Sequence, residues 1–332
     1  MSAEPTKFPS PIGGVPNQHD LAPAVVFAVA YAITIPLVVY RLTSKKSRNI
    51  FCIATAVFAI ERVVDFSFRA VEAEKPNLRT TSFWVNWLQS AYTMGFISIA
   101  GDVGNIARVF LLKSTRGSDP SASAAAPSLD LLASSGTDAD EERPAGTPKA
   151  EGSAAASMTM FDVREAEVLE DEPKRRTLIE RWGLVTLLMR LTALALGGVY
   201  SGFYFGGTTD HSKAVTAQQT RYASDIIMVV YLQLVIAVLL WAYLTRPKRV
   251  ARRPTLFLVA ICLLLDIPAI YRLAAMANYT DSLLSMAPGS LNGPHAKAVF
   301  YVLHIAPELF AGTLLMSVNV REVYGVGGGM RG

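Results

Sequence analysis

The chain has 332 residues, of which 51% are hydrophobic and 17% are charged, with a formal net charge of +4. Soluble proteins usually carry about 25% charged residues, so this composition favours an integral membrane protein. The small positive charge gives no reason to expect nucleic-acid binding. The two cysteines, Cys52 and Cys262, each lie in an apolar stretch, which excludes an extracellular disulfide framework.

The first 21 residues are polar and proline-rich, and they lack the basic-then-apolar pattern of a signal peptide. After them come stretches of about 20 residues or more that are apolar enough to cross a bilayer as helices. These stretches are residues 22–41, 50–70, 84–112, 182–205, 222–244, 255–276 and 298–319. The sequence therefore predicts an all-α polytopic membrane protein, a bundle of seven transmembrane helices.

Lysine and arginine are unevenly distributed between the two ends of these stretches, and basic residues accumulate in cytoplasmic loops. The richer side carries Arg41, Lys45, Lys46, Arg48, Lys113, Arg116, Lys174, Arg175, Arg176, Arg181, Arg246, Lys248, Arg249, Arg252, Arg253, Arg321 and Arg331. The poorer side carries Lys7, Lys75, Arg79, Lys213, Arg221 and Lys297. We therefore expect the N-terminus outside and the C-terminus in the cytoplasm.

This orientation divides the chain into expected segments. They are an extracellular or lumenal tail at 1–21, transmembrane helices 1–3 in 22–112, a cytoplasmic loop at 113–180, transmembrane helices 4–7 in 181–319 and a cytoplasmic tail at 320–332. The loop is rich in Ser, Ala, Pro, Gly and acidic residues, which predicts disorder. It is either a solvated spacer, which we favour, or a docking segment for a cytoplasmic partner.

A glycosylation sequon, Asn278-Tyr279-Thr280, follows the sixth stretch. The expected orientation places it on the lumenal side, where glycosylation takes place. Asn278 is therefore a candidate glycosylation site.

Ionisable residues in the middle of the apolar stretches are the most informative feature of the sequence. At a rise of about 1.5 Å per residue, Glu61, Asp266 and Glu308 all come near the bilayer midplane. Groups within reach of that level are Arg62, Asp65, Arg69, Arg190, Arg272 and His304. Asp65 and Arg69 share a helix face, as do His304 and Glu308, because each pair is spaced four residues apart.

Two further polar groups lie elsewhere in the apolar stretches. Asp102, Asn105 and Arg108 follow one face of the inner half of the third stretch. Asp225 lies near the outer end of the fifth stretch, where Arg221 is its expected partner at the interface.

Charges at this density have two interpretations. They either hold the helices together or line a binding site or translocation path, and intramembrane charge favours function by default. The predicted site comprises Glu61, Arg62, Asp65, Arg190, Asp266, Arg272, His304 and Glu308.

Enzyme signatures are missing from the sequence. A catalytic zinc site needs three protein ligands, but of the four histidines only His304 lies within an apolar stretch. Asp102 stands in "SIAGD", which lacks the first glycine of the Gly-x-Gly-Asp motif of intramembrane aspartyl proteases. Lys297 lies at the outer edge of the last stretch, whereas a retinal protein would need it deeper. We expect no enzymatic activity, no metal and no cofactor.

Several short motifs carry a family resemblance. They are Gln89 followed by small residues and Arg108 in the third stretch, "IYRLA" at the end of the sixth, and "KAVFYVLHIAPELFAGTLLMSVNVRE" through the seventh. This pattern resembles the fungal lipid-translocating exporter family, also called the aminocholesterol-resistance family. The resemblance implies a seven-span fungal membrane protein that handles lipids or amphiphiles.

Together these features predict a multi-pass protein of the plasma membrane or an endomembrane, in contact with membrane lipids. Its expected function is to bind and translocate or export a lipid-like, amphiphilic small molecule at the charged midplane site. The alternative is a divergent seven-helix receptor, of the kind coupled to G proteins, although the Asp/Glu-Arg-Tyr and Asn-Pro-x-x-Tyr marks of rhodopsin-like receptors are absent. Topology shared with receptors is an analogy at the level of the fold.

Overall fold

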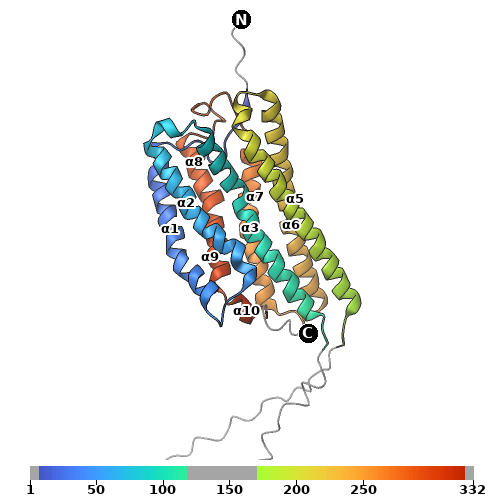
Figure 1. Cartoon of the computed structure of the whole chain (residues 1–332). Helices are drawn as coiled ribbons and strands as arrows, with labels where there is room; N and C mark the ends of the chain where they lie inside the picture. Colours follow the sequence, from blue (N-terminus) through green and yellow to red (C-terminus); the bar gives the residue numbers. More distant parts are fainter. Residues whose placement is uncertain (1–6, 118–169, 326–332) are drawn as a thin grey trace, which may run out of the picture. The chain divides into compact units, whose positions relative to one another are not determined.

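The computed structural model describes residues 7–117 and 170–325. Within them, long helices run up and down a bundle (Figure 1). The long helices are α1 (Gln18–Thr43), α2 (Ile53–Glu74), α3 (Ser82–Ser114), α5 (Pro173–Tyr204), α6 (His211–Thr245), α7 (Arg252–Ala275) and a last helix made of α8 (Pro294–Phe300), the π-helical η4 (Tyr301–Ile305) and α9 (Ala306–Ser317). Short elements flank them: β1 (Phe8–Pro9), η1 (Ile50–Cys52), η2 (Pro76–Leu78), η3 (Gly206–Thr208), β2 (Tyr279–Thr280) and α10 (Val320–Val323).

The structure separates into a helical unit, Met1–Ser114 with Lys174–Gly332, and a second unit, Thr115–Pro173. In the described part of the second unit, the Glu172 N–H donates to the Thr115 carbonyl at 3.0 Å. Residues 118–169, which hold most of the predicted disordered loop, lie outside the described residues.

Six helices of the described chain are long and apolar enough to cross a membrane: α1, α3, α5, α6, α7 and the composite helix α8–η4–α9. Apart from the two-residue strands β1 and β2, the described residues contain no strand. The chain thus has the all-α build and the apolar helices of a multi-pass membrane protein.

Several helices begin earlier than the apolar stretches predict. Helix α1 begins at Gln18, inside the predicted tail 1–21, because Asn17 and Asp20 form a capping box there. Helix α5 begins at Pro173, so residues 173–180 of the predicted loop are helical. Proline is well suited to a first helical position, since the missing N–H has no partner there in any case. Helix α6 begins at His211, where the Asp210 side chain accepts from the Ser212 N–H.

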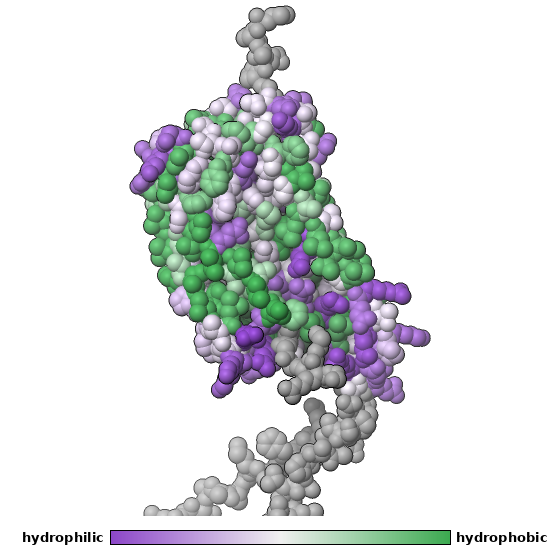
Figure 2. Space-filling view, in the orientation of Figure 1, coloured by the Kyte–Doolittle hydropathy of each residue, from purple (hydrophilic) through white to green (hydrophobic). Residues whose placement is uncertain are grey.

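The surface of the helical unit is apolar around its middle. Figure 2 shows hydrophobic side chains over the centre of the visible face and hydrophilic ones towards both ends. Ile33 of α1 is 72% exposed and Val302 of η4 is 63% exposed. Soluble proteins rarely expose contiguous apolar surface of this kind, so the belt fits contact with lipid.

Helix α2 is the seventh long helix. Unlike an amphipathic helix of a soluble protein, it turns its charged side chains towards the interior and apolar side chains outward. Arg62, Asp65 and Arg69 are all 0% exposed and face the interior. The other face of the helix exposes apolar side chains at intervals of three, four or seven residues: Ile53, Val57, Ile60, Val64 and Val71. Four charged residues lie in its central turns, which is why α2 is not among the six apolar helices.

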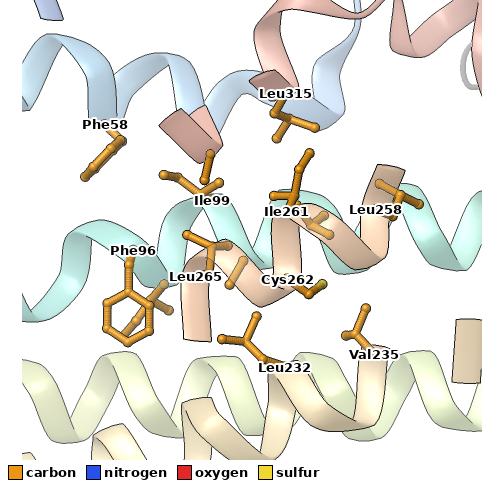
Figure 3. Packing of buried hydrophobic residues seen from close by; sticks show 14 of the residues in the cluster. Phe58, Phe96, Ile99, Leu232, Val235, Leu258, Ile261, Cys262, Leu265 and Leu315 are labelled. Atoms are coloured by element: carbon orange, nitrogen blue, oxygen red, sulfur yellow. The ribbon is translucent and has the colours of Figure 1, made fainter. Parts of the chain in front are cut away.

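The interior differs between the two ends of the bundle. We call the end where α1 begins the N-terminal end, and the end where α3 finishes the opposite end (Figure 1). Towards the opposite end the helices pack through apolar side chains. Figure 3 shows Ile261 and Leu265 of α7 between Ile99 of α3 and Leu232 of α6, with Leu258 further along α7, and all five are 0% exposed. Most of the buried charges lie from the middle of the bundle towards the N-terminal end.

Candidate functional site

Arg62 is the centre of the largest charge cluster at mid-depth. Its Nη2 lies 2.8 Å from Glu308 Oε2, and its Nη1 lies 3.0 Å from Asp65 Oδ2. The second oxygen of Asp65 accepts from Trp87 Nε1 at 2.9 Å. Arg62 and both carboxylates are 0% exposed. A guanidinium thus joins helices α2 and α9 through paired charges.

The Arg62 side chain also has aromatic and glycine neighbours. Its guanidinium lies 4.7 Å from the centre of the Phe58 ring and 5.5 Å from that of Tyr92. Gly95 of α3 provides the room, because a Cβ there would lie 2.2 Å from Arg62 Nη2. Any larger residue at position 95 would displace the charge from its pocket.

His304 lies in the π-helical segment that precedes Pro307. Its Nε2 is 3.1 Å from Glu308 Oε1, and the ring is fully buried among Tyr92, Tyr271 and Phe300. Neither ring nitrogen makes a hydrogen bond within the described residues. His304 and Glu308, which their spacing predicts to share a helix face, are in contact. π-helical turns inside α-helices often occur at functional positions, which makes this segment a candidate.

A second cluster, at the N-terminal end, was missed in the sequence. Asp20 of α1 accepts from Arg69 Nη2 at 2.6 Å and also binds Lys297 Nζ. The Tyr301 hydroxyl accepts from Arg69 Nε at 2.9 Å and donates to Asp20 Oδ1 at 3.1 Å. Arg69 therefore pairs with Asp20 and not with Asp65, although Asp65 and Arg69 share a helix face. The sequence feature that indicates this cluster is the capping box, which brings Asp20 into the first turn of α1.

A third group of paired charges joins α6 and α7. Arg272 Nε lies 2.8 Å from Asp225 Oδ2, and Arg272 also donates to the Tyr92 carbonyl. The expected pair of Asp225 with Arg221 at the interface is wrong. Arg221 is 0% exposed and donates to the backbone carbonyls of Ser10 and Met276 at 3.0 and 2.9 Å. Asp225 lies one helical turn further along α6, where Arg272 is the nearer cation.

Three predicted site residues lie apart from these clusters. Glu61 is half-buried on α2 and outside the ion pairs. Asp266 accepts from Gln233 Nε2 of α6 at 2.7 Å. Arg190 of α5 is half-buried against Gly101 of α3, where a Cβ would lie 2.4 Å from its Nη1. The structure thus brings Arg62, Asp65, His304 and Glu308 together but not all eight predicted residues.

The predicted polar group in α3 does not form a cluster. Asp102 is buried and accepts from the Thr55 N–H at 2.7 Å and from the Thr55 hydroxyl at 2.8 Å. Asn105 is half-buried, and Arg108 is exposed beside Gly183 of α5. The spacing of three residues places their Cα atoms near one face, but the neighbouring helices draw the side chains apart.

The structure has an open groove of about 540 Å³ between α7 and the α8–η4 segment. Its walls are apolar and include Ile267, Ile270, Val299 and Leu303. Its polar residues, Asn278 and His295, lie where α7 has just ended and α8 has just begun. The groove therefore has a polar mouth at the N-terminal end and apolar walls that run along α7 and η4 towards mid-depth.

The groove lies next to the buried charges. Tyr271 lines it, and the Tyr271 ring centre is 5.8 Å from the ring of His304. His304 is itself in contact with Glu308, which pairs with Arg62. A single layer of side chains thus separates the groove from the mid-depth cluster.

Asn278 lines the mouth of this groove and is half-buried. Its side-chain nitrogen donates to the Ala275 carbonyl at 3.0 Å, and its own carbonyl accepts from the Ser10 N–H at 3.0 Å. The residue thereby closes the end of α7. Glycosylation of Asn278 stays a prediction.

No protein-family model, curated protein or solved structure matches the chain. The resemblance to the fungal lipid-translocating exporter family stays a prediction. Within the described residues, no group of three or more His, Cys, Asp or Glu side chains is placed to hold a metal ion.

Proposed function

We propose that the chain is a seven-span membrane protein that binds a lipid-like amphiphile in the groove between α7 and α8 and translocates or exports it. The groove is the observation that carries this proposal. Its apolar walls match an acyl or polycyclic body, and Asn278 and His295 at the mouth match a polar headgroup. Ligand sites commonly have this form, mostly apolar with a few polar groups, and volumes of about 300–1,000 Å³.

Seven spans follow from treating α2 as a membrane helix. Its exposed face is apolar, and its charges point inward, where they are paired with α1 and α9. Charged residues inside membrane proteins characteristically face the bundle interior and pair with one another. A soluble helix of this composition would expose Arg62 and Asp65 and bury Ile60 and Val64.

The N-terminal end is proposed to lie outside the cytoplasm. Of the basic residues on that side, Arg221 and Lys297 are buried, so they are withdrawn from the membrane surface. At the opposite end, Lys45, Lys46 and Arg48 are exposed. Because these two cations are buried, the difference in exposed basic charge between the two ends is larger than the sequence indicates. The end with more exposed basic charge is the one that the positive-inside rule places in the cytoplasm.

The buried charges are proposed to hold the resting bundle closed. Arg62, Asp65, His304 and Glu308 expose no surface, so a passing headgroup would reach them only after a rearrangement. The same observation favours the alternative function, a receptor in which an amphiphile in the groove shifts the helices without being transported. A carrier must open this cluster to the ligand, whereas a receptor needs only a change of pairing.

Binding is tested with a matched pair of groove variants in nanodiscs, using a photoactivatable sterol and a photoactivatable fatty acid as probes. Ala296 lines the groove, whereas Ala298 is exposed on the same helix and does not line it. We expect Ala296→Trp to reduce photocrosslinking of at least one probe about tenfold and Ala298→Trp to leave it unchanged. Equal crosslinking in both variants and in the unaltered protein would show that the groove is not the site.

Carrier and receptor are separated by movement of a fluorescent lipid in vesicles that contain the protein. A carrier is expected to expose the lipid to a quencher on the other side, and Ala296→Trp to abolish that exposure. Binding without movement would support the receptor. Deletion of residues 120–160 is a second discriminator, since it should spare a carrier and impair a receptor that docks a cytoplasmic partner there.

A further inference from the structure

The described N-terminal residues form a cover over one end of the bundle. We call residues 8–17 the N-terminal segment. Ile12 in its centre is 0% exposed, and its N–H donates to Gln89 Oε1 of α3 at 2.9 Å. The Pro9 carbonyl accepts from the Tyr204 hydroxyl of α5 at 2.9 Å. β1 pairs antiparallel with β2, which follows α7. The segment is thus bound to helices from both sides of the bundle.

Buried cations from three helices end on backbone carbonyls of this segment. Arg69 of α2 donates to the Gly13 carbonyl at 2.5 Å, and Arg221 of α6 donates to that of Ser10 at 3.0 Å. Lys297 of α8 donates to the Val15 carbonyl at 2.7 Å. All three cations are at most 2% exposed. Buried cations need hydrogen-bond acceptors, so the segment completes the solvation of these side chains.

Two glycines allow the segment to fit. Gly13 and Gly14 have φ values of 74° and 63°, in the left-handed region that L-residues disfavour. A Cβ on Gly14 would lie 2.4 Å from the Leu291 carbonyl oxygen. The segment therefore follows the loop after β2 at a distance that only glycine permits.

The same loop forms the mouth of the groove. Leu291, which lines the groove, has a φ of 61°, a conformation that is a rare and strained state for a bulky aliphatic residue. The next residue, Asn292, accepts from the Val15 N–H at 2.7 Å and from Asn17 Nδ2, through its carbonyl, at 3.1 Å. The strained conformation of Leu291 is thus held between the groove and the docked segment.

We propose that the N-terminal segment is a lid on the end of the bundle, and that its docking holds Leu291 in place as a wall of the α7–α8 groove. When the lid is released, Leu291 is free to leave the left-handed conformation and the mouth of the groove changes shape. The role of the groove as a ligand site rests on the proposed function, whereas the lid and its hold on the loop do not.

The lid is tested by the reaction of a buried cysteine with a membrane-impermeant maleimide. Ile12→Cys is made in a Cys52→Ala, Cys262→Ala background, since both native cysteines are free thiols. Gly14→Ala is the opening variant, and Gly293→Ala is the control, because a Cβ at Gly293 has no atom within 4 Å. We expect labelling in nanodiscs to be at least tenfold faster with Gly14→Ala and unchanged with Gly293→Ala.

A second opening variant covers the case in which Gly14→Ala does not fold. Asn292→Ala removes the acceptor of the Val15 N–H and should also accelerate labelling. If labelling is equally slow in both folded opening variants, the segment is a fixed part of the core. If the parent cysteine variant reacts as fast as denatured protein, the segment does not cover the bundle. Either result would overturn the lid.

The hold on Leu291 is measured without any ligand, by hydrogen–deuterium exchange of residues 283–293. We expect faster exchange there in Gly14→Ala than in Gly293→Ala. If Ile12→Cys is labelled faster but exchange of this loop is unchanged, the N-terminal segment is a lid that does not hold Leu291 in place. Sterol and fatty-acid crosslinking is measured on the same samples, and failure of both probes in the unaltered protein counts against the proposed function alone.

Discussion

The two halves of the bundle are held together by different interactions. From mid-depth to the N-terminal end, helices are joined by fully buried ion pairs, as between Arg69 and Asp20 and between Arg272 and Asp225. Towards the opposite end, the interior is apolar, with residues such as Leu258 and Ile261 at 0% exposure. The buried acids that border this region, Asp102 and Asp266, are bonded to the uncharged side chains of Thr55 and Gln233.

This difference indicates which half is able to move. An apolar core is closely packed. Any shift of a helix therefore opens cavities, which cost free energy in proportion to their volume. A buried charge that binds several groups at once can exchange one of them while it keeps the others, and Arg69 binds Asp20, Tyr301 and the Gly13 carbonyl together. We therefore infer that the opposite half is the rigid base and that rearrangement takes place among the charges, below the lid.

The largest effect is expected from removing the counter-charge of two buried cations. Asp20→Asn leaves Arg69 and Lys297 without a hydrogen-bonded carboxylate, and breaking a buried pair in this way costs about 3–5 kcal/mol. The free energy of unfolding, measured by denaturant titration in mixed micelles, should fall by that amount. Labelling of Ile12→Cys should also accelerate, because Asp20 connects the lid to α2 and α8.

The matched control for Asp20 is an exposed aspartate. Asp210 is 42% exposed and lies 3.6 Å from Lys213. It caps α6 through Ser212, and asparagine caps a helix equally well. Asp210→Asn should leave the unfolding curve unchanged. If Asp20→Asn were as mild as this control, the N-terminal half would not depend on its ion pairs.

The next effect tests whether the mid-depth charges serve stability or function. Arg62→Met leaves Asp65 and Glu308 buried without a cation and should cost about 3–5 kcal/mol. Adding Asp65→Asn and Glu308→Gln removes the unpaired charges and should restore most of the stability, because apolar or neutral replacements of a whole buried network are often neutral.

The triple variant then separates the two interpretations of the charges. If it is stable and still moves a fluorescent lipid in vesicles, the cluster only holds helices together. If it is stable but inactive, with amphiphile crosslinking in the groove intact, the charges act in translocation. Failure of the triple variant to recover stability would show that the site cannot accommodate uncharged side chains, and would contradict this account of its packing.

The sequence predicts the structure of the two halves of the bundle to different extents. The helices were predicted because apolar stretches of spanning length are a strong signal, and each of the seven stretches overlaps a helix. Within one helix, spacing also works: the four-residue interval of His304 and Glu308 corresponds to a contact of 3.1 Å. Helix positions and spacing within a helix are nearly sufficient to predict the apolar packing of the opposite half.

Pairing between helices was not readable, because it depends on which faces meet. Arg69 has Asp65 four residues away in its own helix, yet it binds Asp20, 49 residues earlier. The sequence places Lys297 at the outer edge of the last apolar stretch, but the residue is 2% exposed under the lid. The polar, proline-rich composition of residues 1–21 indicates a tail, and only the folded bundle provides the cations that bind its carbonyls.

The smallest effect on stability is expected in the apolar half, where the fit between side chains determines the cost of a substitution. Gly104 of α3 faces the Tyr231 hydroxyl, and a Cβ there would lie 1.9 Å from it. Gly312 of α9 also faces the interior, but a Cβ there would lie 3.6 Å from Ile99 and 3.7 Å from Thr55, which is ordinary contact. Overpacking of a rigid core costs about 1–3 kcal/mol, so Gly104→Ala should destabilise the protein.

Gly312→Ala should be neutral or stabilising by about 0.4–1 kcal/mol, since it reduces the entropy of the unfolded chain without a clash. Both free energies are measured by the same denaturant titration. Neither variant should change the labelling rate of Ile12→Cys, because a clash near Tyr231 lies in the rigid base, away from the lid. Accelerated labelling in Gly104→Ala would show that the two halves move together and that the base is not rigid.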